Sequence, residues 1–330
     1  MSTLSPVQAA ERSGLIWGFA FDSGAARPLY QMTPPEAGGL HWLHLNLADQ
    51  RTQRWIGTCA ALPQPLRELL LATDHQPHAV IEGEGLGLAL PDVERDFDDG
   101  EPRLGLMRLA VMPGLIITAR LHPLRSGDVM RERIVAGPPP ETAAQALELA
   151  LGAMAETVRR IVVDADATVQ KIEDRLLDSG HSPDARTFVT LRGLMVRMHR
   201  LLTGARAVLR FVDDDHEDLL PVPFAPVIDK ASRRLASLDT ELLQVQSQLR
   251  LLREEIDLQA TQRTNQNLYI LSILTALMMP ATLVTGLFGM NTGGLPWQQH
   301  PWGTALATGL AVGSAAVVYV ALRLAGFMRR

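Results

Sequence analysis

The sequence predicts an α+β cytoplasmic domain, followed by long helices and a C-terminal two-helix transmembrane hairpin. Charged residues are spread over positions 1–263 and then nearly vanish, and two uncharged runs long enough to cross a bilayer follow. A strict heptad repeat of apolar residues leads into the first of these runs. We therefore divide the chain into an α/β domain (1–140), a helical stalk region (141–263) and the hairpin (264–330).

Composition excludes several classes of function. The net charge of −5 gives no support for nucleic-acid binding, which needs a basic patch. The single cysteine, Cys59, rules out an intrachain disulfide and a CxxC zinc knuckle. No catalytic triad, paired-carboxylate arrangement or nucleotide motif stands out, so we expect neither an enzyme nor a bound cofactor. The polar N-terminus lacks the apolar run of a signal peptide, which predicts that the soluble part stays inside the cell.

Short apolar runs broken by Gly and Pro predict strands in the first domain. They lie at 14–21, 40–47, 78–90 and 104–120, with helices expected at 50–59 and 63–72. The segment GEGLG at 83–87 lacks the Lys-Ser/Thr of a phosphate loop, so we interpret it as a hairpin turn.

From position 141 the pattern becomes helical. Two long helices are predicted, at 141–178 and at 184–212, the second begun by Pro183. An acidic run follows them: Asp213, Asp214, Asp215, Glu217 and Asp218. It is either a solvated corner between helices or a tip that attracts cations.

The helix that enters the membrane carries a heptad seam. Apolar residues alternate steps of three and four from Ile228 to Ile256, a pattern that demands a partner helix. We expect the seam to help hold a pentamer together. Its partner could instead be the helix at 184–212 of the same chain, and the sequence does not decide between them. No Pro or Gly interrupts Ile228–Met279, which predicts one continuous helix into the membrane.

The two spans are Leu268–Phe288 and Gly303–Leu322, of 21 and 20 residues, each about 30 Å long as a helix. Arginines flank the pair on its outer ends, whereas the connection 289–302 has no Lys or Arg. The positive-inside rule then places both termini in the cytoplasm and the connection outside. Pro280, inside the first span, should kink it or loosen its hydrogen bonding.

A second stripe of residues runs along one face of the first span. It holds most of the span's small and hydroxyl side chains, and its members again alternate steps of three and four: Asn265, Leu268, Ser272, Thr275, Met279, Thr282 and Gly286. Such a stripe either packs small residues between helices or, with several copies around an axis, lines a pore. Leu271 joins the lining if the helix rotates slightly. Because neither span contains a carboxylate, His or Cys, a hydrated ion is expected rather than a chelated one.

The residues that follow resemble those of the CorA superfamily of divalent cation transporters. The likeness rests on Arg263-Thr264-Asn265, Pro280, Thr285-Gly286-Leu287-Phe288 and Gly289-Met290-Asn291 just after the first of two C-terminal spans. The Thr-Gly-Gly continuation at 292–294 is more similar to the ZntB zinc-transporter branch than to the magnesium branch. Unlike the magnesium branch, this chain has no Asp or Glu at 292–302.

The resemblance implies a funnel-shaped homopentamer in the cell inner membrane, with the first span lining the pore. The Gly289-Met290-Asn291 loops would cap the pore outside, and Asn291 would contact the metal through its hydration water. The ZntB branch implies uptake of Zn²⁺ driven by protons, with Mg²⁺, Co²⁺, Ni²⁺ and Cd²⁺ as other candidate ions. Two further hypotheses are a CorA-like Mg²⁺ or Co²⁺ channel and a membrane-anchored sensor without a pore. A sensor would need neither the polar stripe nor the loop that begins with Gly289-Met290-Asn291.

Overall fold

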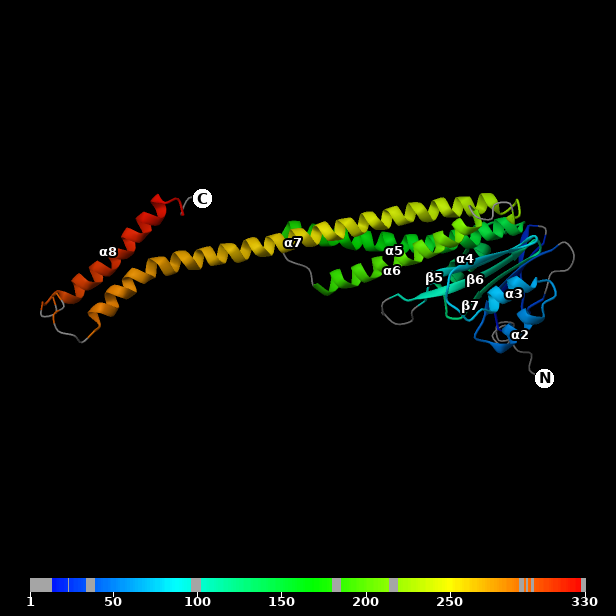
Figure 1. Ribbon diagram of the computed structural model, residues 1–330, viewed down its shortest axis with the longest axis horizontal. Coiled ribbons are helices and arrows are strands. Elements are labelled where there is room, and N and C mark those ends of the chain that lie inside the picture. The colour runs from blue at the N-terminus through cyan, green and yellow to red at the C-terminus, as the bar shows by residue number, and fades with distance from the viewer. Residues whose placement is uncertain are drawn as a thin grey trace. The chain divides into compact units, whose positions relative to one another are not determined.

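The computed structural model describes residues 14–22, 24–33, 39–95, 102–179, 185–213, 219–290, 294, 296–297 and 300–327 (Figure 1). The chain divides into two compact units, Met1–Leu252 and Arg253–Arg330. We describe each unit by itself. The acidic residues Asp214, Asp215, Glu217 and Asp218, and Asn291 of the loop, lie outside the described residues.

The first unit is built on a seven-stranded sheet within the described residues, in the order β2-β1-β3-β7-β6-β5-β4. All neighbouring strands are antiparallel except β3 and β7, which run parallel. The strands are β1 (Leu15–Asp22), β2 (Ala25–Pro28), β3 (Leu40–Asn46), β4 (His78–Glu82), β5 (Gly85–Val93), β6 (Leu104–Met112) and β7 (Leu115–Arg120). The strands predicted from apolar runs are confirmed, whereas the short edge strand β2, largely exposed, was missed.

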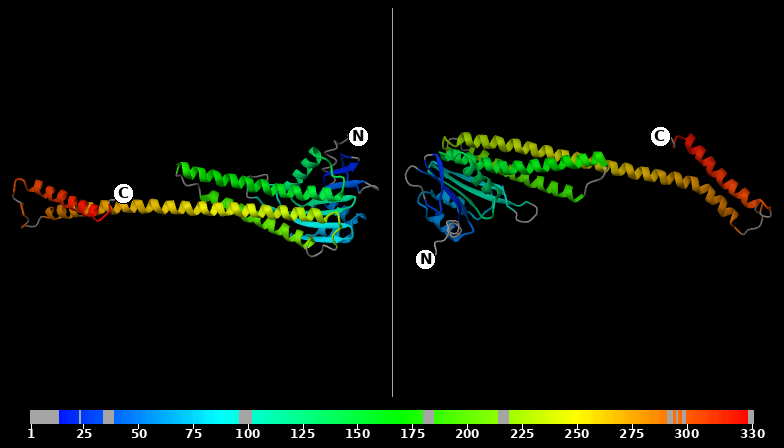
Figure 2. Two further views of the ribbon diagram at one scale, coloured as in Figure 1. Left: turned by 90° about the horizontal axis from the view of Figure 1, so that it is seen from above. Right: turned by 180° about the vertical axis from the view of Figure 1, so that it is seen from behind.

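Helices cover both faces of the sheet, which is why every residue of β5 is buried (Figures 1 and 2). α2 (Gln50–Thr58) and α3 (Gln64–Leu71) enclose a leucine-rich core with β1, β3, β6 and β7. α4 (Arg125–Ala136), α5 (Ala143–Ser179) and α6 (Ala185–Asp213) also pack on the sheet. α4 had no counterpart in the sequence prediction.

The segment GEGLG forms the β4–β5 hairpin turn, as predicted. Gly83 adopts a φ of 58°, a left-handed conformation that glycine reaches without steric cost. Gly85 and Gly87 let α3 approach the strand closely, because a Cβ on either would lie 2.8 Å from a side-chain carbon of Leu66. Gly83 therefore allows the turn, and Gly85 and Gly87 allow close packing of α3 on β5.

The long helix α7 (Ala225–Phe288) is confirmed as one continuous element. In the first unit its seam is buried within the chain, from Ile228 through Leu242 to Leu252. The expectation that the seam holds copies together is therefore wrong for this stretch, and the intrachain alternative is correct. The physical reason is that α5 and α6 lie beside the N-terminal part of α7 (Figures 1 and 2) and cover its apolar stripe.

Charged pairs fix α7 to these two neighbours. Asp239 of α7, which is buried, accepts hydrogen bonds from His199 Nδ1 at 2.9 Å and Arg206 Nη1 at 2.7 Å, both on α6. Lys230 Nζ of α7 lies 2.5 Å from Glu148 Oε1 of α5. A buried carboxylate with two side-chain partners on α6, one of them a guanidinium group, ties the register of α7 to α6.

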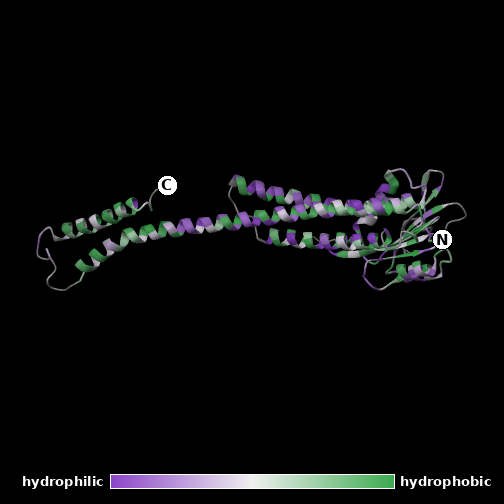
Figure 3. Cartoon of the chain, turned by 45° about the horizontal axis from the view of Figure 1, so that its top comes forward, coloured by the Kyte–Doolittle hydropathy of each residue, from purple (hydrophilic) through white to green (hydrophobic). Residues whose placement is uncertain are grey.

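The second unit contains the C-terminal part of α7 and α8 (Gly303–Leu324). Among the described residues, these two helices are long and apolar enough to cross a membrane. Figure 3 shows α8 and the C-terminal end of α7 as predominantly hydrophobic. The most apolar 18-residue stretch of α7 is 0% buried and that of α8 is 6% buried, so neither packs as the core helix of a soluble protein does. α7 continues through Pro280 and bends in its orange part in Figure 1.

Candidate functional site: the polar stripe of α7

The stripe predicted from the sequence lies entirely within α7 of the second unit. Four of its members gather in one open groove: Thr275, Met279, Thr282 and Gly286. The groove also takes in Met290 of the loop that follows, together with Leu274, Met278, Leu283 and Leu287. The other predicted pore-lining residues, Asn265, Leu268, Leu271 and Ser272, precede the groove along the helix.

The groove is wider than the stripe of sequence analysis. The stripe did not include Leu274, Met278, Leu283 or Leu287, which also line the groove. These residues border the groove because side chains three and four positions apart on a helix share a face. A stripe drawn to include the neighbouring positions on the helix surface would have contained these residues.

The two threonines present oxygen lone pairs to the groove. Thr275 Oγ1 donates to the carbonyl oxygen of Leu271 at 2.8 Å, and Thr282 Oγ1 donates to that of Met278 at 2.9 Å. Each hydroxyl hydrogen is used within the helix, so the outward lone pairs are acceptors. An acceptor suits a water bound to a cation, because such a water offers its hydrogens.

Pro280 lies in the middle of the groove-forming stretch. It has no N–H to donate to the carbonyl of Ala276, four residues earlier, so one main-chain oxygen loses its usual helical partner. Met279, beside it, is 66% exposed. A Cβ on Gly286 would meet no heavy atom within 4 Å, so that end of the groove is open. The groove thus combines two hydroxyls, an irregular backbone and a flexible apolar side chain.

The loop after α7 begins with the predicted ion entrance. Gly289 N donates to Thr285 O at 2.9 Å and Met290 N donates to Leu287 O at 3.3 Å, which ends the helix. Asn291, the third residue of the motif, lies outside the described part. Phe288 stacks on Trp297, with ring centroids 6.4 Å apart and planes 5° apart, so the two sides of the loop are held together.

His300 is committed to the local backbone. Its Nδ1 accepts a hydrogen bond from the N–H of Trp302 at 3.2 Å. Nδ1 is therefore the acceptor nitrogen, and only Nε2 remains for another partner.

The acidic run is only partly described. Asp213 is the last residue of α6, and the other four acidic residues lie outside the described part. Within the described ranges, no group of three or more His, Cys, Asp or Glu side chains could hold a metal ion. A cation-attracting role for the run stays a prediction.

Comparison with known proteins places this arrangement in a family context. A family model described as "CorA-like Mg2+ transporter protein" matches residues 37–324. The zinc transport protein ZntB of Pectobacterium atrosepticum (strain SCRI 1043) is 23% identical over 303 residues, covering 89% of this chain and 90% of that protein. The divalent cation transporter CmaX of Pseudomonas aeruginosa (strain PAO1) is 25% identical over 319 residues, covering 91% and 92%.

A solved structure is similar over nearly the whole chain. The CorA magnesium transporter from Methanocaldococcus jannaschii aligns with a TM-score of 0.77 at 16% identity, covering 95% of this chain and 99% of that one. At this identity the likeness supports the fold: a soluble α+β domain, a long helix and a C-terminal apolar helix.

Proposed function

Since this chain belongs to the family of CorA-like Mg²⁺ transporter proteins, its function is divalent cation transport rather than catalysis, and we propose that the cation is Zn²⁺. The observation that carries the transport role is the uncharged, unburied stretch of α7 with its groove of threonines and methionines. Zinc is favoured by the Thr-Gly-Gly that follows Gly289-Met290-Asn291 and by similarity to proteins named for zinc transport.

One α7–α8 hairpin cannot enclose a pore, so copies must surround an axis. We propose a homopentamer in which the stripe of each α7 faces inward. Thr275 and Thr282 would then form rings of hydroxyl oxygens, and Met279 an apolar ring between them. Neutral oxygens suit an ion that keeps its water, because without carboxylate or imidazole ligands a dehydrated Zn²⁺ would lose more hydration energy than it regains.

The ion would enter at Gly289-Met290-Asn291. The amide oxygen of Asn291 can accept hydrogen bonds from metal-bound water, and Gly289 permits a tight turn at the helix end. We place both termini in the cytoplasm and the loop on the outer side of the inner membrane, from the arginines that flank the spans.

Uptake into proteoliposomes tests this proposal. The purified full chain is reconstituted with an ion-sensitive dye inside, one dye for each cation tested, and flux is compared with and without a pH gradient. We expect Zn²⁺ uptake that an inward proton gradient accelerates. Asn291→Ala should abolish it, while mass measurement in detergent still gives a pentamer for both proteins.

Each alternative has its own outcome in the same assay. A CorA-like channel is the second candidate, favoured by the description of the matching family model and by the magnesium transporter of similar fold. It would carry Mg²⁺ or Co²⁺ in preference to Zn²⁺, Ni²⁺ or Cd²⁺, without need of the proton gradient. A sensor without a pore would carry none of the five ions. A monomer or dimer in detergent would contradict the pore arrangement itself.

A further inference from the structure

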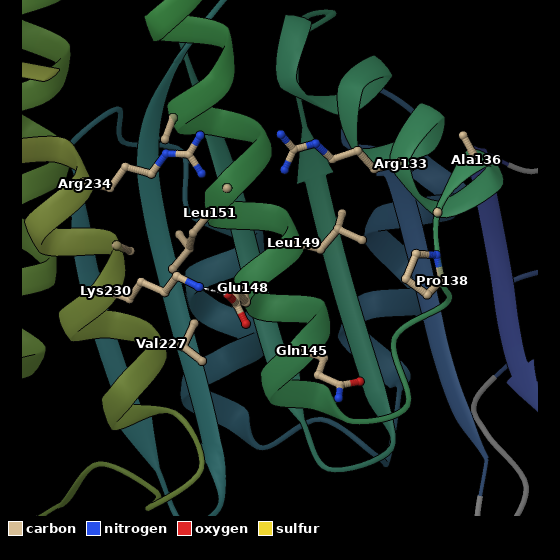
Figure 4. A pocket seen from close by; sticks show the side chains of 14 residues that line it. Arg133, Ala136, Pro138, Gln145, Glu148, Leu149, Leu151, Val227, Lys230 and Arg234 are labelled. Carbon is tan, nitrogen blue, oxygen red and sulfur yellow. Dashed lines mark hydrogen bonds and ion pairs between the residues drawn. The ribbon is translucent and has the colours of Figure 1, made fainter. Parts of the chain in front are cut away.

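A pocket of about 550 Å³ lies within the first unit, between α4, α5 and α7, away from the stripe of α7 (Figure 4). Its floor is the first turns of α5, and its two walls come from α4 with the segment after it and from the start of α7. The lining residues central to the argument are Arg133, Pro138, Leu149, Gly152, Val227 and Arg234. The volume is in the range of sites for small organic ligands.

Two guanidinium groups converge over the floor. Arg133 from α4 and Arg234 from α7 point toward each other across α5 (Figure 4). A Cβ built on Gly152 would lie 3.2 Å from Nη1 of Arg133 and 3.7 Å from Nη1 of Arg234, so the two nitrogens are at most 6.9 Å apart. One phosphate group can bridge this distance by accepting a hydrogen bond of about 2.8 Å from each nitrogen.

The carboxylate that pairs with Arg234, that of Glu156, is shared with two other arginines. Glu156 lies one turn beyond Gly152 and accepts hydrogen bonds from Arg159 and Arg160 at 2.9–3.1 Å, whereas Arg234 is 3.6 Å away. The hydrogen bond from Arg159, chiefly, holds the pKa of Glu156 at about 2. Three arginines thus share one carboxylate, which lies closer to Arg159 and Arg160 than to Arg234.

The remaining acid at the pocket is also paired. Glu148 is engaged by Lys230, and among the described residues no carboxylate forms an ion pair with Arg133. The pocket therefore carries an excess of positive charge. In a protein that transports cations, this site repels the transported ion and favours an anion.

We propose that this pocket binds a nucleotide-sized organic phosphate. Arg133 and Arg234 hold the phosphate, because guanidinium forks match phosphate oxygens in geometry and charge. Pro138, Leu149 and Val227 provide the apolar walls against which the body of the ligand packs. Binding would join α4 and α5 to α7, the helix that also carries the candidate pore residues.

Gly152 gives independent support for an open floor. It is the only glycine of α5, and a glycine inside a helix destabilises that helix relative to alanine. A Cβ at this position would make a tight contact of 3.2 Å with Nη1 of Arg133 and would occupy part of the space between the two guanidinium groups. Because glycine has no side chain, the space that a phosphate needs stays open.

Calorimetric titration of the full chain in detergent tests the proposal. The probes are AMP, inorganic phosphate and adenosine, which separate the anion from the organic body. We expect AMP to bind more tightly than phosphate, and adenosine not to bind. Arg133→Gln and Arg234→Gln should each weaken AMP binding by at least about tenfold.

Gly152→Ala distinguishes ligand binding from folding. It should weaken AMP binding while the melting temperature stays the same or rises. The matched control is Arg54→Gln, an exposed arginine of α2 outside the pocket, which should leave AMP binding unchanged.

Three results would overturn the inference. They are the absence of AMP binding at millimolar concentration, equal affinity for AMP and inorganic phosphate, and equal weakening by Arg54→Gln and Arg133→Gln. The titration contains no transported cation, so its failure is distinct from failure of the proposed transport function.

Discussion

Replacement of Leu242 by alanine tests whether the seam of α7 has its partner inside the chain. Leu242 is 0% exposed, whereas Leu243, the next residue of the same helix, is 48% exposed. The pair offers the same substitution on the covered and the open side of α7. Only the covered side should matter for stability.

The expected magnitude follows from burial. A Leu→Ala change at a fully buried site removes apolar contacts and leaves a cavity, which costs about 2–5 kcal/mol of unfolding free energy. For a unit of this size, each kcal/mol lowers the melting temperature by about 2–4 °C, so Leu242→Ala should melt roughly 4–20 °C lower. Leu243→Ala should cost less than about 1 kcal/mol.

The assay is thermal unfolding of the full chain in detergent, followed by near-ultraviolet circular dichroism at two protein concentrations tenfold apart. Because α5 and α6 of the same chain cover the seam, the loss caused by Leu242→Ala should not depend on concentration. Equal losses for the two variants would refute the burial argument. A loss that grows on dilution would show that the seam lies between copies.

Three more outcomes are expected. Met279→Ser should raise ion leak through reconstituted protein without lowering its melting temperature, since Met279 is 66% exposed in the single chain. An unchanged leak in an intact oligomer would show that the proposed apolar ring of Met279 does not restrict ion flow. Asp239→Ala should cost about 3 kcal/mol in urea unfolding, because it leaves Arg206 without its carboxylate, whereas Asp229→Ala, at an exposed pair, should cost under about 1 kcal/mol. Burial, aided by the charge of Arg120, lowers the pKa of His44 to about 3. Below pH 6.5 the unfolded chain therefore binds a proton at His44 that the folded chain does not bind, and the stability of the folded chain falls as the pH drops. His44→Gln should therefore reduce the stability lost between pH 7 and pH 5 by about 2 kcal/mol, and an unchanged pH profile would contradict this.

Local pattern explains which elements were predictable. Apolar runs bounded by Gly and Pro predicted β1 and β3, and the unbroken run into the membrane predicted α7, since each signal lies in consecutive residues. β2 ends in Pro28, is largely exposed and carries no apolar alternation. α4 mixes charged residues with a few buried ones such as Met130, so its amphipathic pattern is weak. β2 is held by its antiparallel pairing with β1, and α4 by packing against α5 and β5, so tertiary contacts rather than a local pattern stabilise them.

The sequence by itself determined the two apolar spans, the single helix that leads into them and the stripe from Asn265 to Gly286, because charge and periodicity along one helix are local properties. The tertiary structure alone decided what covers the heptad seam. A seam demands a partner but does not identify it, and here α5 and α6 of the same chain provide it. Only folding, too, brings Arg133, Gly152 and Arg234 to one pocket, since their separation along the chain carries no signal that three helices meet there.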